Sequence, residues 1–265
     1  MSDTVTGTTN NQSVSAASPS RRRVRILDTL RGVAIIYMVF YHTLFDLVEM
    51  FGHDWAQGIF RAQDAFSVYF TGTFVLLGGV TVRFSRNPAL RGARLFFLAS
   101  AFTFFTALIF PGSAIYSGVL HLFCIGMLLY AVAGKAIERI PAWVGLPLAA
   151  VLFIFFYNTP NGWIGFGEWP HIEIPEALTW NNLLNGFGFV NRQFSSVDYL
   201  PALPWLFLFI SGVYVGKLLD RNLPEFFYRD WCPPVTWLGK HSLIIYVLHQ
   251  PVIFVLLSVL HMIIR

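Results

Sequence analysis

The chain has 265 residues, of which 55% are hydrophobic and 12% are charged, and its mean hydropathy is +0.60. This composition argues against an ordinary soluble domain and is typical of a protein embedded in a lipid bilayer. The net charge of +4 does not indicate nucleic-acid binding, because beyond the first residues no basic run is interleaved with polar sequence. We therefore expect the lipid bilayer as a partner, and no nucleic acid.

The first 20 residues are rich in Ser, Thr, Asn and Gln and have almost no large apolar side chains. Such a segment cannot bury enough surface to fold, which predicts a disordered cytoplasmic tail over residues 1–20. Four arginines between Arg21 and Arg25 then precede a long apolar stretch, but no small-residue cleavage site follows it. We interpret the stretch as a retained helix that opens one transmembrane domain over residues 21–265.

Apolar runs long enough to cross a hydrocarbon core of about 30 Å recur along the rest of the chain. They predict an all-α integral membrane protein, a bundle of about seven transmembrane helices in which the fifth is the shortest. The predicted spans are 28–50, 64–82, 93–110, 114–133, 143–157, 200–219 and 238–262.

The distribution of Lys and Arg among the connections predicts that the N-terminus is cytoplasmic. In that orientation the outer connections carry Arg61, Arg192 and Arg265, whereas the inner connections hold all the other basic residues outside the spans. The segment 158–199, rich in Trp, Pro, Gly and Asn, is then an extracytoplasmic loop. We expect the protein in the cell membrane, that is, the inner or plasma membrane.

Four ionisable side chains fall inside the predicted spans and away from their ends, where each costs on the order of 2.5 to 3.5 kcal/mol. His42 and Asp46 lie one helical turn apart, so they share a face and can hydrogen-bond directly. His121 reaches about the depth of His42, and His249 lies near the middle of the last span. One interpretation is a histidine base oriented by a carboxylate. The alternative is a set of interhelical hydrogen bonds that holds the bundle together.

His53 lies just beyond the first span, and its surroundings indicate an interfacial residue. On the predicted cytoplasmic side, Arg31 lies in the first turn of the first helix, and Arg83 and Arg86 lie in the following inner loop. Guanidinium groups bind phosphates bidentately, which favours a site for a nucleotide-like cofactor. The alternative is that these arginines reflect only the positive-inside rule. Neither cysteine has metal-site spacing, and we expect no metal.

Several blocks of the sequence resemble, in order, the catalytic-domain family of heparan-alpha-glucosaminide N-acetyltransferase, a group of transmembrane acyltransferases. The opening Leu-Asp-x-Leu-Arg-Gly also occurs in the wider acyltransferase-3 group, but the order and spacing of the blocks make the resemblance more specific. It covers most of residues 22–255. The blocks are 27–34, 41–47, 78–80 with 83–86, 118–122, 238–246 and 249–251.

The resemblance implies that an acetyl group moves from cytosolic acetyl-CoA to a sugar on the far side of the membrane. His42 would be the base, oriented by Asp46, and His121 would donate a hydrogen bond to the developing oxyanion. In the lysosomal relative the position of His42 is asparagine and the catalytic histidine aligns with His53, so either histidine is a candidate base here. The residues expected to bind acetyl-CoA are Arg31, Arg83, Arg86 and His249.

The acceptor implied by the resemblance is an envelope glycan or glycolipid. Two functions of other classes compete: a transporter in which the same His and Asp residues relay protons, and a non-enzymatic membrane subunit of a glycan-assembly complex. Neither predicts that acetyl-CoA stabilises the protein, so that measurement separates them from a transferase. The sequence leaves the oligomeric state open, a homodimer included.

Overall fold

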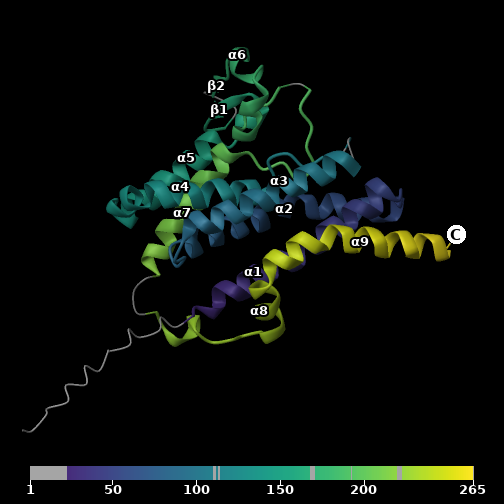
Figure 1. Ribbon diagram of the computed structural model, residues 1–265, viewed down its shortest axis with the longest axis horizontal. Helices are drawn as coiled ribbons and strands as arrows, with labels where there is room; N and C mark the ends of the chain where they lie inside the picture. Colours follow the sequence, from purple (N-terminus) through teal and green to yellow (C-terminus); the bar gives the residue numbers. More distant parts are fainter. Residues whose placement is uncertain are drawn as a thin grey trace, which may run out of the picture.

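The computed structural model describes residues 23–109, 112, 114–167, 171–191, 193–219 and 223–264 (Figure 1). The predicted tail, residues 1–20, lies outside the described residues. Helices dominate the described chain, as predicted for an all-α membrane protein. The main helices are α1 (Arg25–Phe45), α2 (Asp54–Val82), α3 (Pro88–Ile109), α4 (Val119–Arg139), α5 (Ala142–Phe156), α7 (Ala202–Leu218), α8 (Pro233–Lys240) and α9 (Ser242–Ile264).

Six helical segments of the described chain are long and apolar enough to cross a membrane. They confirm six of the predicted spans, and the seventh, α7, is apolar but has 17 residues. Seventeen residues rise about 26 Å, which is at the lower limit for crossing the hydrocarbon core. The fifth span is the shortest, as predicted: α5 has 15 residues, against 17 in α7, and a 3₁₀ turn (Thr159–Asn161) extends its apolar helical segment to 20 residues.

Several predicted boundaries differ from the structure. Helix α2 begins at Asp54, ten residues earlier than predicted, because polar residues in its first turns interrupt the apolar run; Arg61 therefore lies within a helix. Helix α4 begins at Val119 and continues to Arg139. The predicted last span is two helices, since α8 ends at Lys240 and α9 begins at Ser242.

Close packing of α2 against α7 forms the centre of the bundle. A Cβ atom on Gly79 would collide with the carbonyl oxygen of Phe209, and one on Gly212 would collide with that of Leu76. The small residues at Gly79 and Gly212 therefore allow the two helix backbones to approach closely. Phe209 is almost fully buried there, in a core that also includes Val75.

The segment 158–199 between α5 and α7, called here the cap segment, contains short elements. Strands β1 (Trp163–Gly165) and β2 (His171–Glu173) pair antiparallel with Ile164 opposite Ile172, and α6 (Glu176–Thr179) follows. Figure 1 shows these elements gathered beyond one end of α5, while α9 lies beside α1 in a different part of the molecule. The end of the cap segment, residues 197–199, returns to the helices and contributes to a cavity.

Candidate active site

A cavity of about 380 Å³ lies among α1, α2, α9 and the end of the cap segment. Its volume is in the range of small-ligand sites, which are typically about 300 to 1,000 Å³. The ionisable side chains of its wall, tyrosines aside, are His42 and Asp198. Aromatic side chains form much of the remaining wall: Tyr37, Tyr41, Phe45, Phe70, Phe74, Tyr157, Tyr199, Trp205 and Tyr246.

His42 lies on the cavity wall beside a second histidine. The ring centroid of His42, on α1, is 4.8 Å from that of His249 on α9. The Nδ1 atom of His249 lies 2.7 Å from the carbonyl oxygen of Tyr246, which fixes Nδ1 as a donor in the neutral ring and leaves the lone pair on Nε2. That Nε2 atom is buried and has no partner among the described residues. The structure therefore brings together two of the predicted histidines. One of them, His249, has an Nε2 acceptor that no described donor reaches.

Asp46 is fully buried one turn beyond His42, at the start of a π-helical stretch, η1 (Asp46–Met50). Its Oδ1 atom accepts a 2.7 Å hydrogen bond from Nε2 of Gln250, and its Oδ2 atom has no partner in the described chain. The predicted direct hydrogen bond between His42 and Asp46 is therefore wrong. The turn from His42 to Asp46 is still regular, since the amide of Asp46 donates to the carbonyl of His42, but Oδ1 of Asp46 is taken by Gln250; the π-helical stretch follows, and such stretches are frequent at functional sites. The carboxylate instead connects α1 to α9.

The other two histidines predicted to act in catalysis lie off the cavity wall. His121 is in the first turn of α4, and its Nε2 atom is 3.4 Å from Oγ1 of Thr103 on α3. His53 precedes α2, and its ring centroid is 5.8 Å from that of His261 and 6.3 Å from that of Trp55. Of the three predicted candidates, His42 is the one that lines the cavity.

The arginines predicted to bind phosphate differ in their surroundings. Arg31 reaches across to α2, where its guanidinium donates to Oγ1 of Thr81. Arg83 forms a bidentate ion pair with Glu138, with N–O distances of 2.5 and 3.2 Å, and also donates to the carbonyl of Gly216 at 2.9 Å. Arg86 is exposed. Arg83 is thus engaged in connecting α2, α4 and α7, whereas the side chain of Arg86 is open to a ligand.

The Leu-Asp-x-Leu-Arg-Gly block packs directly against α8. A Cβ atom on Gly32 would collide with the carbonyl of Val235, and one on Gly239 would collide with the carbonyl of Asp28. Two of the blocks that carry the family resemblance, 27–34 and 238–246, therefore meet in space. We call this contact the α1–α8 seam.

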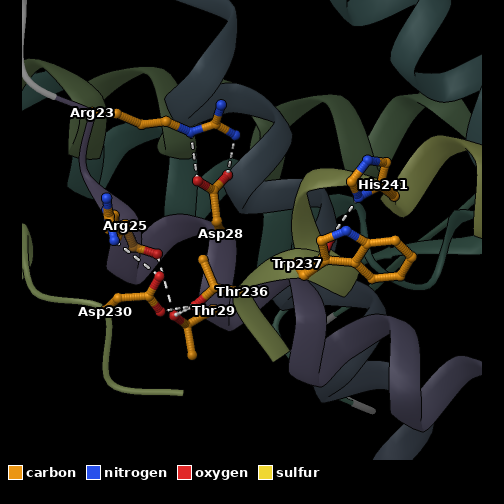
Figure 2. A network of polar contacts seen from close by, with 8 residues as sticks. All are labelled: Arg23, Arg25, Asp28, Thr29, Asp230, Thr236, Trp237 and His241. Atoms are coloured by element: carbon orange, nitrogen blue, oxygen red, sulfur yellow. Dashed lines mark hydrogen bonds and ion pairs between the residues drawn. The ribbon is translucent and has the colours of Figure 1, made fainter. Parts of the chain in front are cut away.

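A network of polar contacts accompanies the α1–α8 seam (Figure 2). Arg23 holds Asp28 through two hydrogen bonds of 2.6 and 2.9 Å, so Asp28 pairs with Arg23 and not with the neighbouring Arg31. The other contacts are Arg25 to Asp230 at 3.0 Å, Thr29 to Thr236 at 2.8 Å and Thr236 to Asp230 at 2.7 Å.

Comparison with protein families matches residues 23–251 to the model described as heparan-alpha-glucosaminide N-acetyltransferase, catalytic. The chain belongs to this family. Neither the comparison with curated proteins nor the comparison with solved structures finds a match. Membership of this family, together with six helices able to cross a membrane, makes the chain a transmembrane protein of an acetyltransferase family. The match includes the whole cavity wall and ends immediately after Gln250 and Pro251.

Sequence reasoning missed three residues of this family member's site. Gln250 and Tyr246 lie within sequence blocks that carry the resemblance, which was a usable signal. Asp198 lies in the cap segment and had no such signal. Its Oδ2 atom accepts a 2.7 Å hydrogen bond from the hydroxyl of Tyr246. Burial raises the pKa of the Asp198 carboxyl above its ordinary value, while this hydrogen bond partly lowers it.

Proposed function

We propose that the protein is a membrane acetyltransferase that moves an acetyl group from cytosolic acetyl-CoA to an amine or hydroxyl of an envelope glycan or glycolipid. The observation that carries this proposal is the position of His42. It lies on the wall of an aromatic-lined cavity next to the cap segment, in a chain whose family is named for N-acetyl transfer.

The proposal includes an orientation with the N-terminus in the cytoplasm of a cell whose inner or plasma membrane holds the bundle. The contacts of the helix ends support it, because the basic residues Arg83 and Lys217 meet at one end, where Lys217 donates to the carbonyl of Ile140. The cap segment belongs to the opposite helix ends. Acetyl-CoA would enter from the basic end, and the acceptor from the end that carries the cap segment.

In the proposed reaction, neutral His42 removes a proton from the acceptor amine or hydroxyl as this group attacks the acetyl carbonyl. A C–N or C–O bond forms, the C–S bond of the thioester breaks, and the proton passes to the sulfur to give the free thiol of CoA. His249 supports His42 from 4.8 Å away, with its own ring oriented by the carbonyl of Tyr246. The geometry does not support a role for His121 at the oxyanion, because it lies off the cavity wall.

Asp46 acts in this proposal as a positioning residue. Its hydrogen bond to Gln250 fixes the turn of α9 that carries His249 against the turn of α1 that carries His42. Misplacing a catalytic group by about 1 Å can cost on the order of 100-fold in rate, so this contact would affect turnover although it does not touch the acceptor.

For the donor, we retain Arg31 and Arg86 as proposed ligands of the CoA phosphates and assign Arg83 to structure. His249, also predicted to bind the donor, would meet the thioester end of acetyl-CoA and not its phosphates, because it lies beside His42.

The test is the melting temperature of the detergent-purified protein with and without millimolar acetyl-CoA, because a ligand that binds the folded state raises it. We expect an upward shift that shrinks in Arg31→Ala. The matched variant Arg83→Gln should melt at a lower temperature without acetyl-CoA, since it loses an ion pair, yet keep the full shift. No shift in the wild type would contradict the proposal and favour the transporter or the non-enzymatic subunit.

A further inference from the structure

Asp198 faces the same cavity as His42 but comes from outside the helical bundle. It lies in the last residues of the cap segment, four positions before α7 begins at Ala202. One carboxylate oxygen, Oδ2, accepts the 2.7 Å hydrogen bond from Tyr246. Within the described chain no donor reaches the second oxygen, Oδ1. This atom is not fully enclosed by protein. The second oxygen is therefore available to a molecule in the cavity.

The backbone at Asp198 is held in an unfavourable conformation. Asp198 has a φ of 56° and Ser117 a φ of 58°, and these are the non-glycine residues of the described chain in the left-handed region. The two are adjacent in space, since the amide of Leu200 donates to the carbonyl of Ser117 at 2.9 Å. A side chain on Gly118 would approach Asp198 to 3.3 Å. Such strain persists where the surroundings fix it, and it concentrates at functional sites.

Tyr246 connects this carboxylate to the proposed base. Its hydroxyl donates to Asp198, and its carbonyl oxygen accepts from Nδ1 of His249, which in turn lies beside His42. A single residue of α9 therefore positions both the carboxylate and the histidine pair. Aromatic rings at Tyr199 and Trp205 complete this part of the wall. Apolar surface with a few convergent polar groups is the usual character of a site for an organic ligand.

We propose that Asp198 binds the acceptor, its carboxylate accepting a hydrogen bond from a hydroxyl or amino group of the sugar while Tyr246 holds the carboxylate in place. This inference rests on the proposed function and adds the residue that recognises the acceptor. The acceptor's nucleophilic group would then lie between Asp198 and His42. The cap segment, through Asp198, would present the acceptor to the base on α1.

The experiment measures release of CoA thiol from acetyl-CoA, with glucosamine and methyl glucoside as probe acceptors. Asp198→Asn keeps the size of the side chain and tolerates the left-handed backbone, and it should raise the KM for the probe acceptor by tenfold or more. Asp198→Gly removes the carboxylate and relieves the backbone strain, so it should show at least the same rise in KM without a lower melting temperature. Stabilisation by acetyl-CoA should stay at the wild-type level in both variants.

Tyr246→Phe keeps the aromatic wall and removes the donor to Asp198, and we expect a smaller rise in the KM for the acceptor, about threefold. The matched control is Tyr69→Phe, which loses a hydroxyl on an exposed part of α2 and should behave as wild type. An active wild type whose Asp198 variants keep its acceptor KM, or lose only melting temperature, overturns this inference alone. A wild type that releases no thiol with either sugar overturns the proposed function, and this inference with it.

Discussion

The α1–α8 seam and the cavity are both built from sequence blocks that carry the family resemblance, yet their polar groups are used in opposite ways. In the seam, the polar side chains of the network are paired with one another: Asp28 with Arg23, and Asp230 with Arg25 and Thr236. Beside the cavity, buried atoms of Asp46, His249 and Gln250 have no partner among the described residues.

The paired polar groups of the seam stabilise the fold, whereas the unpaired ones beside the cavity are available for chemistry. Buried polar groups are normally satisfied, and unsatisfied ones behind the cavity wall, next to His42, indicate a place where a ligand or a water completes the hydrogen bonds. The Leu-Asp-x-Leu-Arg-Gly block, the easiest part of the sequence to recognise, serves mainly helix packing through Gly32 and Asp28. The ease with which a block is recognised therefore does not show that it carries the reaction.

The largest loss of stability should come from adding a side chain where α1 and α8 meet in the seam. Gly239→Ala places a Cβ atom against the carbonyl of Asp28, so α8 must shift, and we expect a loss of about 1 to 3 kcal/mol of stability, measured as a lower melting temperature. Gly58→Ala is the matched control, because no atom lies within 4 Å of its added Cβ. It should melt at or slightly above the wild-type temperature. Equal melting of the two variants would contradict the account of the seam.

An effect on stability no larger than that in the seam, with a clear effect on turnover, is expected at Asp46. Asp46→Leu leaves the amide of Gln250 without its partner in a buried place, which costs about 1 to 3 kcal/mol and frees α9 from α1. Thiol release should fall by about 10- to 100-fold. Asp46→Asn keeps an oxygen that accepts from Gln250 and should retain most of the turnover. If both variants lose turnover equally, the charge of Asp46 matters and its role is not positioning alone.

The smallest effect is the pH dependence of stability at Asp198. Burial raises the pKa of this carboxyl in the folded protein above its unfolded value. Its contribution to stability is therefore fully present below the unfolded pKa, near 4, and is lost as the pH rises through the folded pKa. Asp198→Asn, which does not titrate, should gain melting temperature relative to wild type as the pH rises from about 4 towards neutrality. A difference that is constant across this range would contradict the raised pKa.

Much of the helical architecture could be predicted from the sequence, because apolar length and the spacing of small residues are local properties of the chain. Six spans and the packing role of Gly79 and Gly212 follow from them. The break at His241 between α8 and α9 could not be predicted in the same way. Leu238 and Gly239 are apolar and adjoin the last apolar run, so the sequence joins them to the last span, whereas their place in a separate helix depends on packing against α1.

The site was predictable in part. His42 and His249 drew attention because an ionisable side chain inside a span requires an explanation, and the structure places them side by side. The partner of Asp46 was not predictable, because Gln250 lies on another helix, 204 positions along the chain. Asp198 was missed because its position depends on how the cap segment folds back over residues 117 and 118. The Arg83 to Glu138 ion pair joins two helices 55 positions apart, which spacing along one helix cannot show.

The most direct measurement of the central claim is CoA thiol release by His42→Ala and His53→Ala, each compared with its own stabilisation by acetyl-CoA. Because His42 lines the cavity and His53 does not, His42→Ala should lose turnover by 100-fold or more while its shift in melting temperature with acetyl-CoA stays near wild type. His53→Ala should retain most of its turnover. Loss of turnover in His53→Ala with activity preserved in His42→Ala would contradict the account and move the base away from the cavity.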